Sequence, residues 1–234
     1  MVQQLTCPAR QRQAFALGLF AIAVGWLTAS QCCGSGQGDS PARQEGVTFV
    51  DLQPKTNQKL KEPFHGSTDA NNLAEVKQEK QTLAGLKFNI GAGLIQLANA
   101  NLKDQYPEKV EGIKVDAKFA KLHILHGTGH SVADGTVIAK YVVRFADKSE
   151  EKIDVVYGED VRDWWRHDDD KEPTRGKVAW KGANESAKSN GCSIWLFSQT
   201  WKNPRPEKTV ATIDYISTLT EAAPFVVAMT LQEK

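Results

Sequence analysis

Alternation of apolar and polar residues with a period of two constrains the fold of this chain more than any other feature of its sequence. Between residues 137 and 145 the apolar positions share one face of an extended chain: Val137, Ala139, Tyr141, Val143 and Phe145. Lys140 and Arg144 fall on the opposite face. Because successive side chains of a strand point to opposite sides, this pattern predicts a strand with one buried face.

Segments of this kind recur, separated by Gly, Asn, Asp or Pro. They predict further strands at 47–52, 85–90, 93–98, 110–115, 118–126, 153–157, 177–181, 192–199, 209–217 and 224–231. Only 70–80 has a helical pattern. Many short strands with so little helix predict an all-β fold, an antiparallel two-sheet β-sandwich of jelly-roll type. The core is expected to include Val143, Phe145, Val155, Ile194, Leu196, Ile213 and Val227.

An uncharged run near the N-terminus indicates export. Arg10 and Arg12 precede an apolar run over 14–27, too short to span a bilayer comfortably but as long as a signal-peptide core. Residues 1–33 are therefore predicted to be a signal peptide. A lipoprotein signal is the alternative, with Cys32 as the lipidated residue. Both interpretations predict an exported protein, located in the periplasm, at the cell surface or secreted. The other alternative is that the apolar run is an uncleaved anchor.

Residues 34–46 are rich in Gly, Ser, Gln and Pro and predict a flexible linker, which leaves 47–234 for the β-sandwich domain. The chain has 29 basic and 28 acidic residues, and two basic residues leave with the signal. The near-neutral mature surface argues against a nucleic-acid partner. No second long apolar run exists, so we expect no membrane span in the mature chain apart from a lipid anchor.

Several motifs follow one another in an order that is typical of a known group of sandwiches. They include YVVRFAD at 141–147, DWW at 163–165, AWKGAN at 179–184 and WKNPRP at 201–206. With these motifs the chain resembles the jelly-roll modules of the galactose-binding-domain-like superfamily, which occur in secreted and surface proteins of bacteria. The resemblance implies a two-sheet sandwich and a carbohydrate-binding module, although members of this superfamily bind diverse ligands.

Five of the six tryptophans lie within 164–201, either at the end of a core or on a surface that stacks against a ligand. Sugars stack the apolar C–H face of a pyranose on an indole ring. Trp164 and Trp165 are neighbours, so alternation predicts that at most one packs in the core and the other is exposed. Trp180 and Trp195 alternate with other apolar residues and are expected in the core.

We expect the loops at 163–167 and 201–203 to form one ligand face at an edge of the sandwich, because strand ends carry sites. The predicted ligand-binding residues are Asp163, Trp164, Trp165, Arg166, Asn184, Trp201 and Asn203. For the two asparagines the alternative is a structural role, capping turns through local backbone hydrogen bonds.

Metal-binding patterns are weak. His123 and His126 fall on opposite faces of a strand and cannot share one ion without a bulge. Asp168, Asp169 and Asp170 with Glu172 offer oxygen ligands, but their spacing matches no calcium loop and favours a solvated acidic turn. We predict no cofactor, with a structural calcium as the open alternative.

No GxSxG elbow, HExxH motif or P-loop occurs in the sequence. The sequence therefore predicts an exported non-catalytic binding module whose partner is a carbohydrate or cell-surface glycan. One alternative is a structural or protein-interaction domain that contacts other envelope proteins and buries its tryptophans. A glycoside hydrolase with an unrecognised acid pair is the other, since Asp163, Asp168 and Glu172 lie near the tryptophans.

Overall fold

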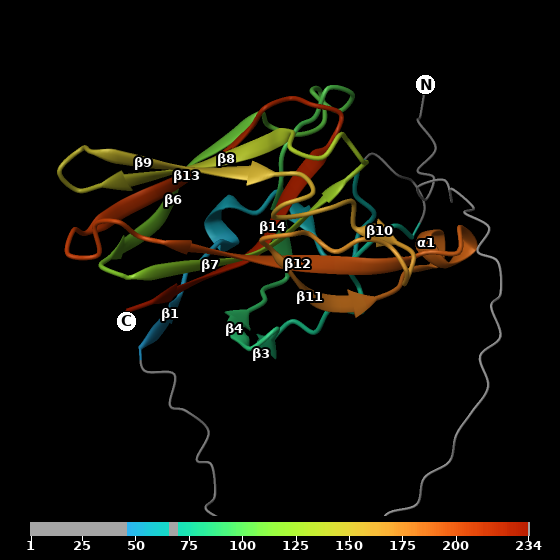
Figure 1. The fold of residues 1–234 in the computed structure, drawn as a ribbon, viewed down its shortest axis with the longest axis horizontal. Helices are drawn as coiled ribbons and strands as arrows, with labels where there is room; N and C mark the ends of the chain where they lie inside the picture. The colour runs from blue at the N-terminus through green and yellow to red at the C-terminus, as the bar shows by residue number, and fades with distance from the viewer. Residues whose placement is uncertain (1–45, 66–69, 234) are drawn as a thin grey trace, which may run out of the picture. The chain divides into compact units, whose positions relative to one another are not determined.

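The computed structural model describes residues 46–65 and 70–233, which form an antiparallel all-β sandwich, so the predicted fold class is confirmed (Figure 1). Helix in the described residues is confined to α1 (Glu185–Ser189) and the 3-10 turn η1 (Gln53–Lys55). The predicted signal peptide and nearly all of the predicted linker lie outside the described residues.

The larger sheet has eight strands, and its centre is built from three long ones (Figure 1). β12 (Ser193–Lys202) pairs with β7 (Lys121–Gly129), which pairs with β14 (Ala223–Gln232). Shorter strands flank them: β1 (Val47–Phe49), β2 (Gln58–Lys59), β5 (Gly93–Gln96), β10 (Trp165–Arg166) and β11 (Lys177–Gly182). Among the described strands β11 pairs with β12 alone, so β11 is an edge strand.

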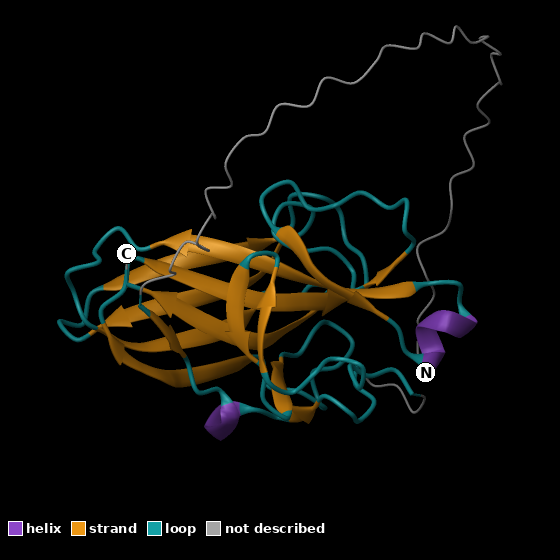
Figure 2. Cartoon of the chain, turned by 90° about the horizontal axis from the view of Figure 1, so that it is seen from below, coloured by secondary structure: helices purple, strands orange, loops and turns teal. Residues whose placement is uncertain are grey.

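The second sheet has four strands in the order β6 (Lys109–Ala117), β13 (Val210–Ser217), β8 (Val137–Phe145) and β9 (Glu150–Val156). A separate hairpin joins β3 (Lys80–Leu83) to β4 (Leu86–Asn89). Figure 2 shows the long strands running together through the body of the molecule, with loops gathered at their ends.

The main core lies between the two sheets and follows the predicted alternation. On β12, Trp195 and Phe197 belong to this core, whereas Ile194 and Leu196 face the other way. Burial of each such side chain contributes roughly 1.5–3 kcal/mol. The predicted buried residues are all buried: Val143, Phe145, Val155, Ile194, Leu196, Ile213 and Val227.

A second hydrophobic cluster covers the opposite face of the larger sheet. Two stretches, residues 60–65 and residues 70–76, bring Leu60, Phe64, Leu73 and Val76 to it. The predicted helix at 70–80 is wrong, since this stretch consists of turns, bends and the start of β3. Its apolar residues are spaced as in a helix, but they reach the sheet from separate turns instead of one helical face.

The loop from Tyr157 to Gly176 is held by a buried carboxylate. Asp160 is 0% exposed and accepts a hydrogen bond from the backbone N–H of Val156 at 2.8 Å. Arg175 donates to both oxygens of the same carboxylate, each at 2.7 Å. A buried charge is tolerated only when it is paired and hydrogen-bonded. This pair therefore fixes the two ends of the loop against each other.

Replacing Asp160 by Asn should destabilise the protein by about 2–4 kcal/mol, because a buried, charge-assisted network loses its charge. Glu159→Gln is the matched control, since Glu159 also contacts Arg175, at 3.2 Å, but is 44% exposed. An exposed pair contributes about 0–1 kcal/mol. Urea unfolding of the variants measures both effects, and equal losses would contradict the role of the buried carboxylate.

Candidate functional site

The Trp164–Trp165 pair, at the centre of the predicted ligand face, is buried. Trp164 is 0% exposed, and its ring centroid lies 4.7 Å from that of Phe64. Trp165 is 3% exposed and donates its Nε1–H to Asn71 Oδ1 at 3.0 Å. The expectation that one of the pair is exposed is wrong, because residues 60–65 and 70–76 cover the second face of the sheet. Neither ring offers a stacking surface.

Asp163 and Arg166, predicted beside these rings, support the same loop from inside. Asp163 accepts from the backbone N–H of Trp165 at 3.1 Å and from the Ser131 hydroxyl at 3.2 Å. Burial raises the pKa of Asp163 to about 7, because desolvation disfavours the charged carboxylate. Arg166 is buried, with its Nε 3.3 Å from an Asp170 oxygen. Both side chains are thus used within the fold.

The two predicted asparagines cap local structure. Asn184 is the N-cap of α1, and its Oδ1 accepts from the backbone N–H of Ala187 at 2.7 Å. Asn203 accepts from the N–H of Arg205 at 2.9 Å and donates to the Phe119 carbonyl at 2.9 Å. These bonds match the structural alternative, in which polar side chains satisfy backbone groups at helix and turn termini.

The two predicted site loops lie at opposite ends of β12. Trp165 pairs with Ile194 near the start of the strand, whereas Trp201 pairs with Leu122 near its end. At about 3.3 Å per residue, these positions are roughly 20 Å apart. The prediction that both loops form one ligand face is wrong. Both loops carry tryptophan beside polar residues at strand ends, but this shared pattern does not show at which end of the sheet each loop lies.

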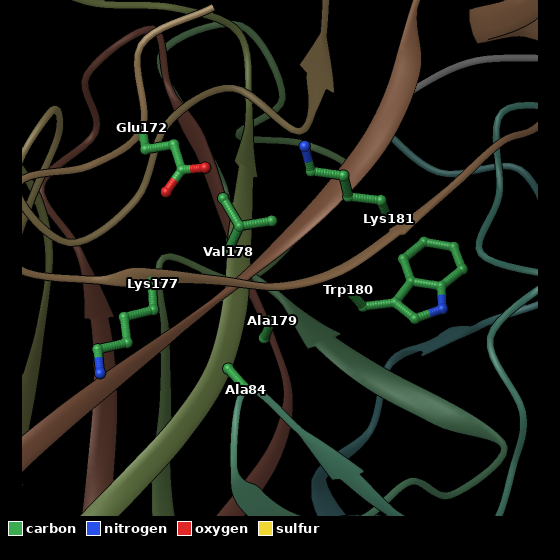
Figure 3. Close-up of a pocket in the computed structure, with 7 residues that line it drawn as sticks. All are labelled: Ala84, Glu172, Lys177, Val178, Ala179, Trp180 and Lys181. Carbon is green, nitrogen blue, oxygen red and sulfur yellow. The ribbon is translucent and has the colours of Figure 1, made fainter. Parts of the chain in front are cut away.

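A surface groove of about 670 Å³ lies instead along the edge strand β11 (Figure 3). Its walls come from β11, from the β3–β4 turn and from the loop before β11. The lining residues are Ala84, Glu172, Lys177, Val178, Ala179, Trp180 and Lys181. Figure 3 shows Lys177 and Trp180 on opposite sides of Val178 and Ala179. An aromatic ring and charged groups therefore share one open hollow.

A β-bulge at Ala179 sets which side chains face this groove. Val178 pairs with Phe197 and Trp180 pairs with Leu196, so the extra residue interrupts the alternation. A bulge of this kind moves the following side chains to the other face. Val178 accordingly packs against the main core, and Trp180 packs against the second cluster.

The prediction that Trp180 lies in the core beside Val178 is wrong for the same reason. Trp180 is partly buried, with one side packed against the second cluster and the rest accessible. Regular alternation cannot reveal a bulge. One sequence signal of an irregular strand is Gly182, because a glycine inside a strand often marks a bulge or a close approach. Gly182 lies two residues after Trp180, on the same face of the strand.

Three charged side chains line the groove, and those of Lys177 and Glu172 are open to solvent. Lys177 and Glu172 are exposed, and neither side chain forms an ion pair with the described residues. Lys181 is engaged, because its Nζ lies 3.7 Å from the ring centroid of Trp195. The groove thus offers a cationic donor and an anionic acceptor beside a partly exposed indole.

Strand addition to β11 is disfavoured. Edge strands that carry lysines and bulges resist pairing with another chain. β11 has Lys177, Lys181 and the bulge at Ala179 within six residues. Ligand recognition is therefore expected from the side chains of the groove more than from the strand's backbone.

No group of three or more His, Cys, Asp or Glu side chains within 46–65 and 70–233 is arranged to hold a metal ion. His123 bonds Thr200 at 2.9 Å and Gln232 at 3.0 Å. His126 is buried, and desolvation lowers its pKa to about 4. In the acidic turn, Asp170 accepts from the backbone N–H of His167 at 2.7 Å.

No family model and no curated protein matches this chain. The structure alone shows the fold, and the likeness to galactose-binding modules stays a proposal. The described part of the chain contains no helix with the length and apolar character that a membrane crossing needs.

The raised pKa of Asp163 predicts a component of stability that falls with rising pH. Between pH 4 and 7 the folded state keeps this carboxyl protonated, while the unfolded state ionises it. Because the folded state therefore binds more protons than the unfolded state, the free energy of unfolding falls as the pH rises. Relative to Asp163→Asn, the wild type should lose on the order of a few kcal/mol across this window. Urea unfolding of both proteins at pH 4.5 and 7.5 gives this difference. The contributions of the histidines cancel, because both proteins contain the same histidines. Parallel profiles would contradict the prediction.

Trp165→Ala should destabilise the protein by about 3–5 kcal/mol, because it opens a cavity and removes one of the two hydrogen bonds that Asn71 Oδ1 accepts, the other coming from Asn184 at 3.2 Å. Thermal unfolding should show a clear fall in Tm. Trp201→Ala is the control, since Trp201 is partly exposed and meets Phe119 edge-on, with the two ring centroids 6.4 Å apart. A Trp165→Ala variant as stable as the wild type would show that the ring is not part of the core.

Proposed function

We propose that this protein is an exported, non-catalytic binding module that holds a carbohydrate in the β11 groove. The observation that carries the proposal is the position of Trp180. Its indole packs against the second cluster on one side and is partly accessible in the wall of the groove. Ligand sites combine such an apolar surface with a few polar groups on a rigid scaffold. Here the scaffold is the eight-stranded sheet.

The groups around Trp180 suit a sugar. The apolar C–H face of a pyranose would stack on the indole, as aromatic rings stack on one another. Glu172 would accept hydrogen bonds from hydroxyl groups, and Lys177 would donate to their oxygens. This combination supports a polyhydroxylated ligand more than a purely apolar one.

The same groove supports a binding role over hydrolysis. Glycoside hydrolysis generally uses two carboxyl groups that flank the scissile bond. Among the described residues that line the groove, Glu172 is the single carboxylate. Asp163, which lies near the tryptophans in the sequence, is buried and hydrogen-bonded to Ser131 and Trp165.

The second candidate is a structural or protein-interaction domain of the envelope. It is favoured by the burial of Trp164, Trp165 and Trp195, which serve the interior of the fold. A glycan array separates the candidates, since an interaction domain would bind no saccharide. The jelly-roll, galactose-binding-like identity belongs to the first candidate and supports it by resemblance.

Export rests on the apolar segment near the N-terminus, with release by signal peptidase or lipidation of Cys32 as the alternatives. N-terminal sequencing and mass measurement of protein from its native host test this. A mature protein that begins at Met1 would contradict export, and a diacylglycerol mass on Cys32 would identify a lipoprotein.

Trp180→Ala should weaken saccharide binding about tenfold, because a stacking contact contributes about 1–2 kcal/mol. Trp201→Ala is the matched control, since Trp201 is also partly exposed but lies at the far end of β12. Titration calorimetry with xylo-, gluco-, manno- and galacto-configured tetrasaccharides measures both. Equal effects of the two substitutions, or none, would place the site elsewhere.

A further inference from the structure

We infer that Gly182 is a positioning residue for this site: the space above its Cα is occupied by the indole of Trp180, and this fixes the ring in the groove wall. The inference rests on the proposed function of Trp180 as the saccharide platform. It adds a residue that neither lines the groove nor touches a ligand, and that acts through the ring.

The geometry is steric. A Cβ on Gly182 would lie 2.1 Å from Cη2 of Trp180, 2.3 Å from Cζ2 and 3.0 Å from Cζ3. Carbon atoms in non-bonded contact need about 3.5–4 Å. The first two distances rule out any side chain at this position while the ring keeps its place.

Backbone conformation does not explain this glycine. Gly85 and Gly191 have φ values of +78° and +69°, and a Cβ at either position would meet no atom within 4 Å, so their role is conformational. Gly182 is absent from the positive-φ positions, and its backbone suits other residues. The absence of a side chain at Gly182 therefore makes room for the indole ring of Trp180.

The strand places the two residues together. Trp180 pairs with Leu196 and Gly182 with Ile194, so both point to the second cluster from neighbouring positions on one face. The ring lies between this cluster and the solvent. A methyl group on Gly182 would force the indole to turn away and would remove the flat surface beside Ala179.

Four proteins test the inference: wild type, Gly182→Ala, Trp180→Ala and the double variant. Gly182→Ala should shift the Trp180 indole N–H resonance and weaken tetrasaccharide binding about tenfold. In the Trp180→Ala background the same glycine substitution should lower neither Tm nor affinity, because the obstructed ring is gone and alanine fits this backbone conformation. Loss of stability in the single variant with no further loss in the double variant also supports the inference.

Two results would overturn it. One is wild-type affinity and an unmoved Trp180 resonance in Gly182→Ala. The other is an equal loss of Tm from the glycine substitution in both backgrounds. Failure of the wild type to bind any tetrasaccharide would instead refute the proposed function, and the resonance and the Tm comparison would still decide the role of Gly182.

Discussion

The buried carboxylate of Asp160 fixes the loop from which the edge strand β11 and the groove beside it begin. It joins the end of β9 to Arg175, and the backbone N–H groups of Arg175 and Gly176 both bond the Glu159 carbonyl at 2.7 Å. Gly176 lies so close that a Cβ there would be 2.0 Å from the Asp160 carbonyl oxygen. The edge strand β11 begins at the next residue. Its start, and hence the groove, is therefore fixed by a charge pair on the other side of the loop.

The sequence predicted most of the fold, because strands that bury one face must alternate. The predicted bounds of β8 match the structure to the residue, and the other strands of both sheets are predicted within a few residues of their ends, except the two-residue strands β2 and β10. What alternation could not predict was the layer that covers the second face of the larger sheet. Residues 60–65 and 70–76 reach that face from separate turns, and the apolar spacing of the second stretch resembles that of a helix at 70–80. Elements of two residues, such as β10, are too short to carry a periodic signal.

The candidate site was harder to predict, because the exposure of a tryptophan depends on elements far away in the sequence. The sequence around Trp164 and Trp165 predicts one exposed ring at the rim of the sandwich, yet both rings pack in the second cluster with Phe64 and Leu73. Trp180 follows the pattern of a core residue, yet a single inserted residue turns it to the groove. In both cases the exposure of the ring is decided by packing or by a bulge, and neither leaves a trace in the local periodicity.

The bulge at Ala179 links the protection of the sheet edge to the formation of the groove. With regular alternation, Trp180 would point with Val178 into the main core. The edge of β11 would then present a regular row of unpaired backbone N–H and C=O groups to other chains. The extra residue disrupts that edge, which discourages strand addition. It also turns the indole to the outer face, where Gly182 leaves room for it. A feature that keeps the sheet from pairing with a second chain thus creates the one partly open aromatic surface of the groove.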